Sequence, residues 1–387
     1  MSSVETFISE RNLPFEPRHK RFVNVKNFLS QPGNLLVNGG NEDMRTQLLL
    51  NELALQGGVT VILTSSAHLE EAIINAACNG QINRKLVVCS DDYANYHPMY
   101  GVSRAAGAAF FANIGEVLGF RERSALISYY NTLSELYERI ESKPLSLMGL
   151  INFASQSITE LGMLAANQGP LLHEKLISAE AGRKPFHDIL SLLKGEFDQF
   201  CSFTELSIGT VINAGTPLIL FIRPSGNPQL TAALFTAELQ SVLLKPFNLI
   251  VYESDFINDT HFAQIINQKK QASGTTSVFC KNIVSYPEYE TLQRNMPRQI
   301  HVLMNNHEVN STDIQKGLDG LGMYTRFEKT TSVSTPMRLF FSMETSEHKG
   351  MITYQRPRVL YQEVNQASAV LLSPQTDLIV ASKLSFK

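Results

Sequence analysis

Asn34-Leu-Leu-Val-Asn-Gly-Gly-Asn-Glu-Asp-Met-Arg-Thr46 is the stretch of sequence that decides the fold. Its apolar start, 34–37, predicts a short buried strand, and the glycine pair Gly39-Gly40 ends that strand. From Glu42 to Gln56 leucines recur at helical spacing, which predicts a helix. A strand, a glycine loop and a helix in this order are typical of phosphate-binding turns, because the loop and the helix N-terminus direct N–H groups at an anion.

The loop matches part of the phosphate-binding consensus G-x-x-x-x-G-K-[ST], known as the P-loop. In that consensus backbone N–H groups cradle phosphate, the lysine reaches the β- and γ-phosphates, and the hydroxyl holds Mg²⁺. Gly39 and Thr46 occupy the first and last positions, and Gly40 follows the first. Met44 stands where the second glycine belongs, and Arg45 stands where the lysine belongs. These residues are the candidate nucleotide-binding site, in a degenerate form.

The two substitutions predict a phosphate site that is too damaged for standard ATP hydrolysis. Glycine lets the backbone wrap phosphate in conformations that a β-carbon disfavours, so Met44 is expected to obstruct the cradle. Arg45 keeps the positive charge but replaces a compact ammonium with a planar fork. Glu42 and Asp43 complement the helix dipole with their own carboxylates and repel phosphate. The alternative interpretation is an ordinary capped strand–helix turn without a ligand.

Beyond this turn, apolar strands alternate with amphipathic helices. A helix over 67–77 separates the next two predicted strands, 59–64 and 85–89. Later predicted strands span 216–222, 247–252, 275–279 and 299–304. Strands that alternate with helices at this spacing predict an α/β fold with a mainly parallel sheet and right-handed crossovers.

Residues 101–200 differ in character, because their apolar residues keep helical spacing and show no strand pattern. We therefore predict an all-α domain inserted into the α/β core. The tail alternates apolar and polar residues, which predicts a few antiparallel strands. The predicted parts are an N-terminal arm, a core in two segments, the insertion and a small β-rich C-terminal extension, with bounds 1–30, 31–100 with 201–338, 101–200, and 339–387.

The segment Asn248-Leu-Ile-Val-Tyr-Glu253 is a candidate for the acidic strand of a P-loop ATPase, in which an apolar run ends in a Mg²⁺-binding aspartate. Glu253 is the candidate catalytic residue. If it is the catalytic glutamate, Tyr252 stands at the Mg²⁺ position. If it is the metal-binding acid, Ser254 stands at the catalytic position, and Asp255 assists in either case. A buried strand that ends in polar residues gives the same pattern without function.

Composition narrows the classes of function. Of the 387 residues, 43% are hydrophobic and 18% are charged, so the chain can bury a large core. The formal net charge of −3 argues against attraction of the whole protein to nucleic acid. The four cysteines form no CxxC pair, so we expect a reducing compartment and no metal site.

The sequence contains no uncharged apolar run of about 18 residues and no basic–apolar leader. We therefore expect a cytoplasmic protein without direct membrane insertion, which partners recruit to the inner face of the membrane. The basic run Arg18-His-Lys-Arg21 is either a solvated arm or a contact for phosphate or acidic lipid. Arg121, Arg123 and Arg223 are candidates for arginine fingers that reach a neighbouring subunit.

The order of these features resembles the TraG/TraD-type coupling ATPases of conjugation and type IV secretion, in the HerA/FtsK branch of RecA-like motors. In that family a turn similar to asparagine-proline-leucine leads into an all-α domain, and His97-Pro-Met99 is similar to that turn. Asn282 falls near the family's polar sensor residue, and Gly320-Leu-Gly322 is similar to the end of its last helix. The resemblance covers residues 30–325 and implies a RecA-like P-loop core.

The resemblance and the damaged motifs together imply a catalytically impaired ATPase-like subunit with a structural or regulatory role in a secretion or DNA-translocation assembly. Its partners would be other subunits of an oligomeric complex, an intact ATPase among them. No cofactor is expected, with ATP and Mg²⁺ as the alternative. Two other functions stay open: an active divergent motor that uses Arg45 and Glu253 on DNA or protein, and a protein-binding module in which the turn at Gly39 is architectural.

Overall fold

The computed structural model describes residues 18–121, 123–198, 200, 205–269, 274–303, 324–328, 351–355, 369–373 and 376–386. A ten-stranded sheet forms its centre, in the order β1-β12-β11-β8-β2-β7-β6-β3-β5-β4. In this sheet β11 runs antiparallel to both of its neighbours, and every other neighbouring pair is parallel. The α/β class and the mainly parallel sheet expected from the sequence are confirmed.

The strands near the candidate site lie in the middle and at one edge of the sheet. They are β2 (Leu35–Gly39), β3 (Thr60–Thr64), β4 (Lys85–Ser90), β5 (Leu218–Arg223), β6 (Asn248–Tyr252), β7 (Thr276–Cys280) and β8 (Arg298–Val302). The outer strands are β1 (Arg18–Asn24), β11 (Ala369–Ser373) and β12 (Thr376–Ser385). Two further strands, β9 (Tyr324–Glu328) and β10 (Met351–Gln355), pair with each other in a second, antiparallel sheet.

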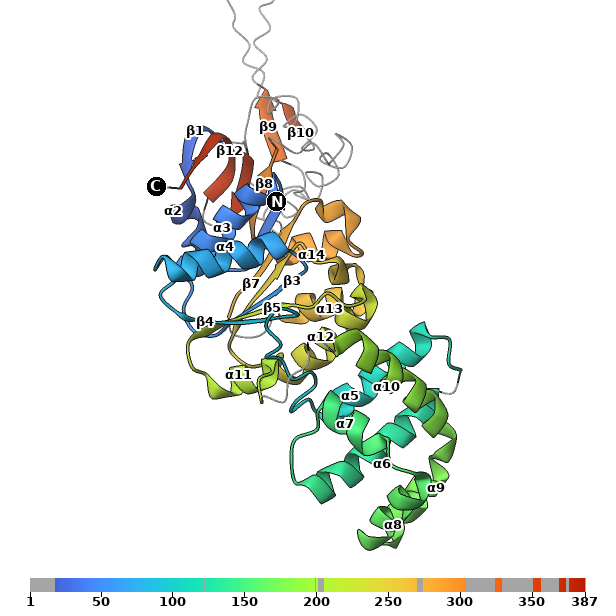
Figure 1. Cartoon of the computed structure of the whole chain (residues 1–387). Helices are drawn as coiled ribbons and strands as arrows, with labels where there is room; N and C mark the ends of the chain where they lie inside the picture. The colour runs from blue at the N-terminus through green and yellow to red at the C-terminus, as the bar shows by residue number, and fades with distance from the viewer. Residues whose placement is uncertain are drawn as a thin grey trace, which may run out of the picture.

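Helices cover both faces of the large sheet (Figure 1). One face carries α2 (Val25–Leu29), α3 (Glu42–Leu55) and α4 (Ala67–Cys78). The other carries α12 (Pro228–Val242), α13 (Thr260–Lys269) and α14 (Tyr289–Asn295). Successive strand residues point to opposite faces of the sheet. Leu35 and Val37 therefore lie in the hydrophobic core under α2, α3 and α4, and Leu36 lies in the core under α12, α13 and α14. Burial on both faces explains why these strands are nearly continuous apolar runs.

Between β4 and β5 the described part of the chain contains helices and no strand. These are α5 (Arg104–Val117), α6 (Arg123–Glu141), α7 (Leu147–Ala154), α8 (Ile158–Asn167), α9 (Pro170–Ser178), a short 3₁₀ helix η1 (Glu180–Gly182), α10 (Arg183–Phe197) and α11 (Ile208–Ala214). Figure 1 shows α5 to α10 extending away from the sheet, with α8 and α9 at the far end. Aromatic packing joins α5, α6 and α10, since the ring of Phe111 lies 5.0 Å from that of Tyr130 and 4.7 Å from that of Phe186.

One buried carboxyl ties together the two chain segments that connect the sheet to these helices. Glu238 of α12 is 1% exposed and accepts hydrogen bonds from the Tyr96 hydroxyl and, at 2.7 Å, from the Met99 N–H. The Tyr96 hydroxyl in turn accepts a hydrogen bond from the Ile208 N–H at 3.3 Å. Burial raises the pKa of Glu238 to about 7.

Two strands that lie far apart in the sequence pair at one edge of the sheet. Residues 18–29, expected in an N-terminal arm, form β1 and α2, and β1 pairs in parallel with β12. Lys20 and Arg21 are exposed on this edge strand, which fits the use of charged residues to protect sheet edges. β1 is short and basic and lacks alternating apolar residues, so its own sequence does not predict that it pairs with β12. The helix expected near 311–321 and the Gly320-Leu-Gly322 segment lie outside the described residues.

No helix in the described part of the chain combines the length and apolar character needed to span a bilayer.

Candidate nucleotide-binding site

The loop expected to bind phosphate lies between β2 and α3, and glycine is required there. Gly39 and Gly40 have φ angles of +87° and +75°, a region that favours glycine. A β-carbon on Gly40 would lie 2.9 Å from Cγ1 of Val302 in β8. Any other residue at position 40 would therefore be strained at this φ angle and would require Val302 to shift.

Asn41 and the acids of the first turn occupy the N-terminus of α3. The Asn41 side chain accepts a hydrogen bond from the Met44 N–H at 3.0 Å, as an N-cap does. Glu42 accepts a hydrogen bond from the Ser66 hydroxyl at 2.6 Å. Met44 is partly buried against the core on this face of the sheet. The Met44 N–H, a donor that a phosphate would need, is thus already satisfied.

Arg45 turns back into its own loop. It is 1% exposed, and its Nη1 donates hydrogen bonds to the carbonyl oxygens of Gly39, at 3.1 Å, and Gly40. Its Nε and Nη2 pair with the carboxylate of Glu253. A planar guanidinium can serve these acceptors at once because its five N–H donors are fixed in a fork.

Glu253 follows β6 and completes a buried ion pair. Its side chain is 9% exposed and that of Arg45 is 2% exposed. Burial is the largest influence on Glu253 and raises the pKa of its carboxyl, while Arg45 opposes this rise. The pair brings together residues from two separate motifs of the sequence, across the intervening strand β7.

The backbone of Glu253 is held in an uncommon conformation. Its φ angle is +41°, which is unfavourable for a residue with a β-carbon. The Glu253 N–H donates to the Phe279 carbonyl at 2.9 Å, and its own carbonyl accepts from the Ser65 hydroxyl at 2.6 Å. These contacts to β7 and to the end of β3 hold the carboxylate toward Arg45. Such a conformation persists only when its surroundings enforce it.

Tyr252 engages the residue expected to hold Mg²⁺. Its hydroxyl donates to the Glu42 carbonyl at 3.2 Å and lies 2.9 Å from the Thr46 hydroxyl. Because Tyr252 has one hydroxyl hydrogen, Thr46 donates and Tyr252 accepts in the second bond. Ser254, the alternative catalytic position, is buried, and its hydroxyl bonds to the Tyr252 carbonyl at 3.4 Å.

Two further candidates, Asn282 and Arg223, have structural contacts within the chain. Asn282, the expected sensor, caps a short 3₁₀ helix η3 (Ile283–Ser285), and its side-chain oxygen accepts from the Val284 N–H at 3.1 Å. Arg223, a candidate arginine finger, forms a largely buried ion pair with Glu70 of its own chain. A residue not singled out in the sequence, Asn38, links the loop to η3 by accepting from the Ile283 N–H at 2.9 Å. Its only sequence signal is its place directly before the glycine pair.

The carboxylates and carbonyl oxygens around the loop disfavour the binding of an anion while Arg45 is paired with Glu253. The Arg45 guanidinium is paired with Glu253, Lys281 is a second positive charge near Glu253, and Glu42 and Asp43 add two carboxylates in the first turn of α3. The carbonyl oxygens of Gly39 and Gly40 point at the guanidinium, so this part of the loop presents acceptors to the site. A phosphate would have to displace both sets of contacts. The groups that could hold a Mg²⁺ ion here are the Thr46 hydroxyl and the Glu253 carboxylate.

No protein-family model and no curated protein matches this chain. Among solved structures, the bacterial conjugative coupling protein TrwBdeltaN70 in a trigonal form with sulphate aligns with a TM-score of 0.56 and 12% identity, over 97% of this chain and 96% of that chain. The plasmid coupling protein TrwB in complex with the GTP analogue GDPNP aligns with a TM-score of 0.51 and 11% identity, over 100% and 93% of the two chains. VirB4 of Thermoanaerobacter pseudethanolicus aligns with a TM-score of 0.47 and 13% identity over 76% and 83%, too weakly to support an argument.

These similarities concern the arrangement of the chain and not its activity, because the identities are low. They extend over the sheet and the helices between β4 and β5, since the alignments cover almost the whole of both chains. The chain therefore has the RecA-like fold seen in the coupling protein TrwB, which is the fold that the resemblance to coupling ATPases predicted.

Proposed function

We propose that this protein is a catalytically impaired, ATPase-like component of a secretion or DNA-translocation assembly, with a structural or regulatory role. It would work in the cytoplasm as part of an oligomer, beside an intact ATPase and other subunits. Its α/β core would dock on a neighbouring core, and its helical insertion would bind a partner protein. It would need no cofactor.

The observation that carries this proposal is the position of the Arg45 guanidinium. In a working P-loop the equivalent lysine projects toward the β- and γ-phosphates. Here the arginine is bonded to two loop carbonyls and to Glu253 instead. A nucleotide could use neither the positive charge nor the acid without breaking the buried pair, which supports loss of hydrolysis.

The contact between Thr46 and Tyr252 supports the same conclusion for the metal. A P-loop hydroxyl binds Mg²⁺ through its oxygen, and an aspartate on the acidic strand completes the site. Tyr252 occupies the last position of β6 and bonds to Thr46 at 2.9 Å. A phenol is a much weaker metal ligand than a carboxylate at neutral pH, and burial raises the pKa of Tyr252 further.

Calorimetric titration of the full chain with ATP and Mg²⁺, paired with a phosphate-release assay, tests the proposal. We expect no binding in the micromolar range and no phosphate release. Micromolar binding with hydrolysis that Arg45→Ala abolishes would contradict the proposal and favour the active motor. Glu253→Gln serves as the second variant, because a divergent motor would lose hydrolysis through it while retaining nucleotide.

A further inference from the structure

The edge of the large sheet at β1 is basic. Exposed lysines and arginines lie on β1 and on the two elements beside it: Lys20 and Arg21 on β1, Lys26 on α2 and Lys383 on β12. Figure 1 shows these three elements together at one end of the molecule, away from α8 and α9. The chain from 18 to 41, together with β11 and β12, contains five lysines and arginines and one acid, Asp377.

The exposed cations of this edge have no acidic partners. Lys20, Arg21, Lys26 and Lys383 form no ion pair with any residue that the structure describes. By contrast, Arg139 and Lys175 of the helical insertion both pair with one acid, Glu135. Because unpaired cations that lie close together repel one another, an anionic partner would relieve the repulsion.

An exposed aromatic ring lies among these cations. Phe22 of β1 is 55% exposed, and its register partner on β12 is Lys383. The Cζ atom of Arg21 lies 5.4 Å from the centroid of the Phe22 ring. Charged side chains protect the edge of a sheet from pairing with other strands. Protection therefore explains the lysines and the arginine, but it does not explain an exposed phenylalanine beside them.

We propose that the edge formed by β1, α2 and β12 binds the anionic surface of a lipid bilayer. The four cations would lie at the level of the charged headgroups, and the Phe22 ring would enter the boundary between headgroups and acyl chains. A single-stranded nucleic acid offers similar phosphate charge, but its bases stack on open aromatic faces. The guanidinium of Arg21 already covers part of the Phe22 ring, which favours the bilayer.

Lipid binding at this edge goes beyond the proposed function and is independent of it. Neither Arg45 nor Glu253 belongs to the edge, so the binding or exclusion of a nucleotide at the loop leaves the expected lipid contact unchanged.

Co-sedimentation of the full chain with lipid vesicles tests the edge. The probe vesicles contain phosphatidylcholine with about 30% phosphatidylserine, and the reference vesicles contain phosphatidylcholine alone. We expect binding to the phosphatidylserine vesicles only. This binding should be lost at an ionic strength of about 0.5 M, where the screening length falls to about 4 Å.

Variants of the edge should weaken the binding in proportion to what they remove. Each lysine or arginine at an anionic bilayer surface strengthens binding about fivefold, so Lys20→Gln with Arg21→Gln should weaken it roughly 25-fold. Lys26→Gln with Lys383→Gln should weaken it to a similar extent, and this second pair leaves β1 unchanged in case the first variant folds poorly. Phe22→Ser should weaken binding at least about fivefold, because no ring enters the bilayer.

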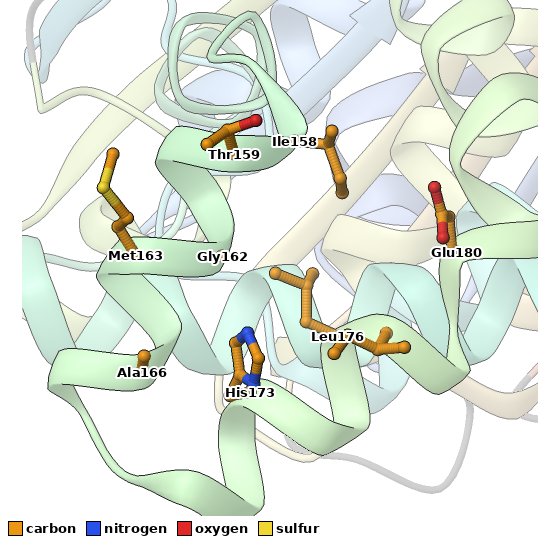
Figure 2. Close-up of a pocket in the computed structure, with 9 residues that line it drawn as sticks. Ile158, Thr159, Gly162, Met163, Ala166, His173, Leu176 and Glu180 are labelled. Carbon is orange, nitrogen blue, oxygen red and sulfur yellow. The ribbon is translucent and has the colours of Figure 1, made fainter.

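Two control variants lie outside the edge. Lys143→Gln with Lys194→Gln removes two exposed lysines between β4 and β5 and changes the net charge by the same amount. Met163→Ser is the apolar control, because Met163 is 57% exposed but lies beside the groove between α8 and α9 (Figure 2). Both controls should bind the vesicles like the unmodified protein.

Four results would overturn the proposal. The first three are absence of sedimentation with phosphatidylserine vesicles, equal binding to both kinds of vesicle, and an equal loss of binding in the edge variants and the controls. The fourth comes from fluorescence anisotropy with labelled single-stranded DNA. Binding of this DNA that both edge pairs weaken, without binding to vesicles, would assign the edge to nucleic acid instead.

Discussion

A double-mutant cycle on Arg45 and Glu253 measures how much their interaction stabilises the loop between β2 and α3. Arg45→Met removes the donor to the Gly39 and Gly40 carbonyls and leaves a buried carboxylate without a counter-charge. Glu253→Gln leaves a buried guanidinium in the same position. Removal of one partner from a buried ion pair costs about 3–5 kcal/mol. We expect each single variant to lose local stability of that size.

The double variant should lose much less, because it leaves neither buried charge unpaired. Replacement of a whole buried pair by neutral groups of similar size is often close to neutral. The carbonyls of Gly39 and Gly40 still lose their donor, so we expect a residual cost of about 1 kcal/mol. Single costs of about 3–5 kcal/mol each and a double cost of about 1 kcal/mol give an interaction energy of about 5–9 kcal/mol between Arg45 and Glu253.

Hydrogen exchange measured by mass spectrometry is the assay, because it reports the opening of individual segments. A global unfolding curve would mix the sheet with the helical insertion and would not be two-state. Peptides that cover β2 and α3 give the local free energy of opening in the four proteins of the cycle. The matched control cycle uses Arg123 and Glu116, an exposed pair separated by 3.5 Å, for which we expect less than about 0.5 kcal/mol.

Two results would refute the reasoning. An interaction energy for Arg45 and Glu253 no larger than that of the control pair would mean that the guanidinium is not held in the loop. Slower exchange of α3 on addition of ATP and Mg²⁺ to the unmodified protein would mean that the nucleotide enters in spite of the pair.

Three further predictions concern single residues. The carboxyl of Glu238 has its pKa raised from 4.5 to about 7, so its stabilising contribution should be full below pH 4.5 and lost as the pH rises through 7. In hydrogen exchange of α12 measured at a series of pH values, Glu238→Gln should remove about 3 kcal/mol of this pH dependence. Gly40→Ala should destabilise β2 by at least about 1 kcal/mol in hydrogen exchange, and Val302→Ala should relieve the steric part of that loss but not the strain at a φ of +75°. Tyr252→Phe should destabilise α3 by about 1 kcal/mol, because Thr46 loses its acceptor, and a thermal scan with and without Mg²⁺ should show no rescue by the metal.

The central part of the fold could be predicted from the sequence because its signals are local. The strands at 34–37, 59–64 and 248–252 are apolar runs bounded by glycine or polar residues, and helices with apolar periodicity separate them. The outer strands could not be predicted in the same way. β1 is a basic segment whose pairing with β12 depends on residues more than three hundred positions away. Pairing of that kind leaves no periodic pattern in the strand itself.

The sequence drew attention to residues that meet in the structure, but it could not give the contacts between them. The motif positions drew attention to Arg45, Thr46, Tyr252 and Glu253, and the structure brings these four side chains together in two contacts. That the guanidinium pairs with Glu253 follows from the order of β2, β7 and β6 in the sheet, which the sequence of the loop does not encode. The uncommon φ angle at Glu253 is likewise set by its neighbours.

The competition between the buried pair and a nucleotide gives a scale for the proposed impairment. A P-loop with micromolar affinity has a binding free energy of about −8 kcal/mol. If the nucleotide must first break the contact between Arg45 and Glu253, a cost of about 3–5 kcal/mol weakens its dissociation constant by roughly 10²–10⁴. A lysine at position 45 would hold the loop less firmly, because an ammonium lacks the planar fork that bonds to two carbonyls and a carboxylate together. In the proposed impairment, Arg45 therefore contributes more than Met44, whose side chain packs against the core and whose N–H is already bonded to Asn41.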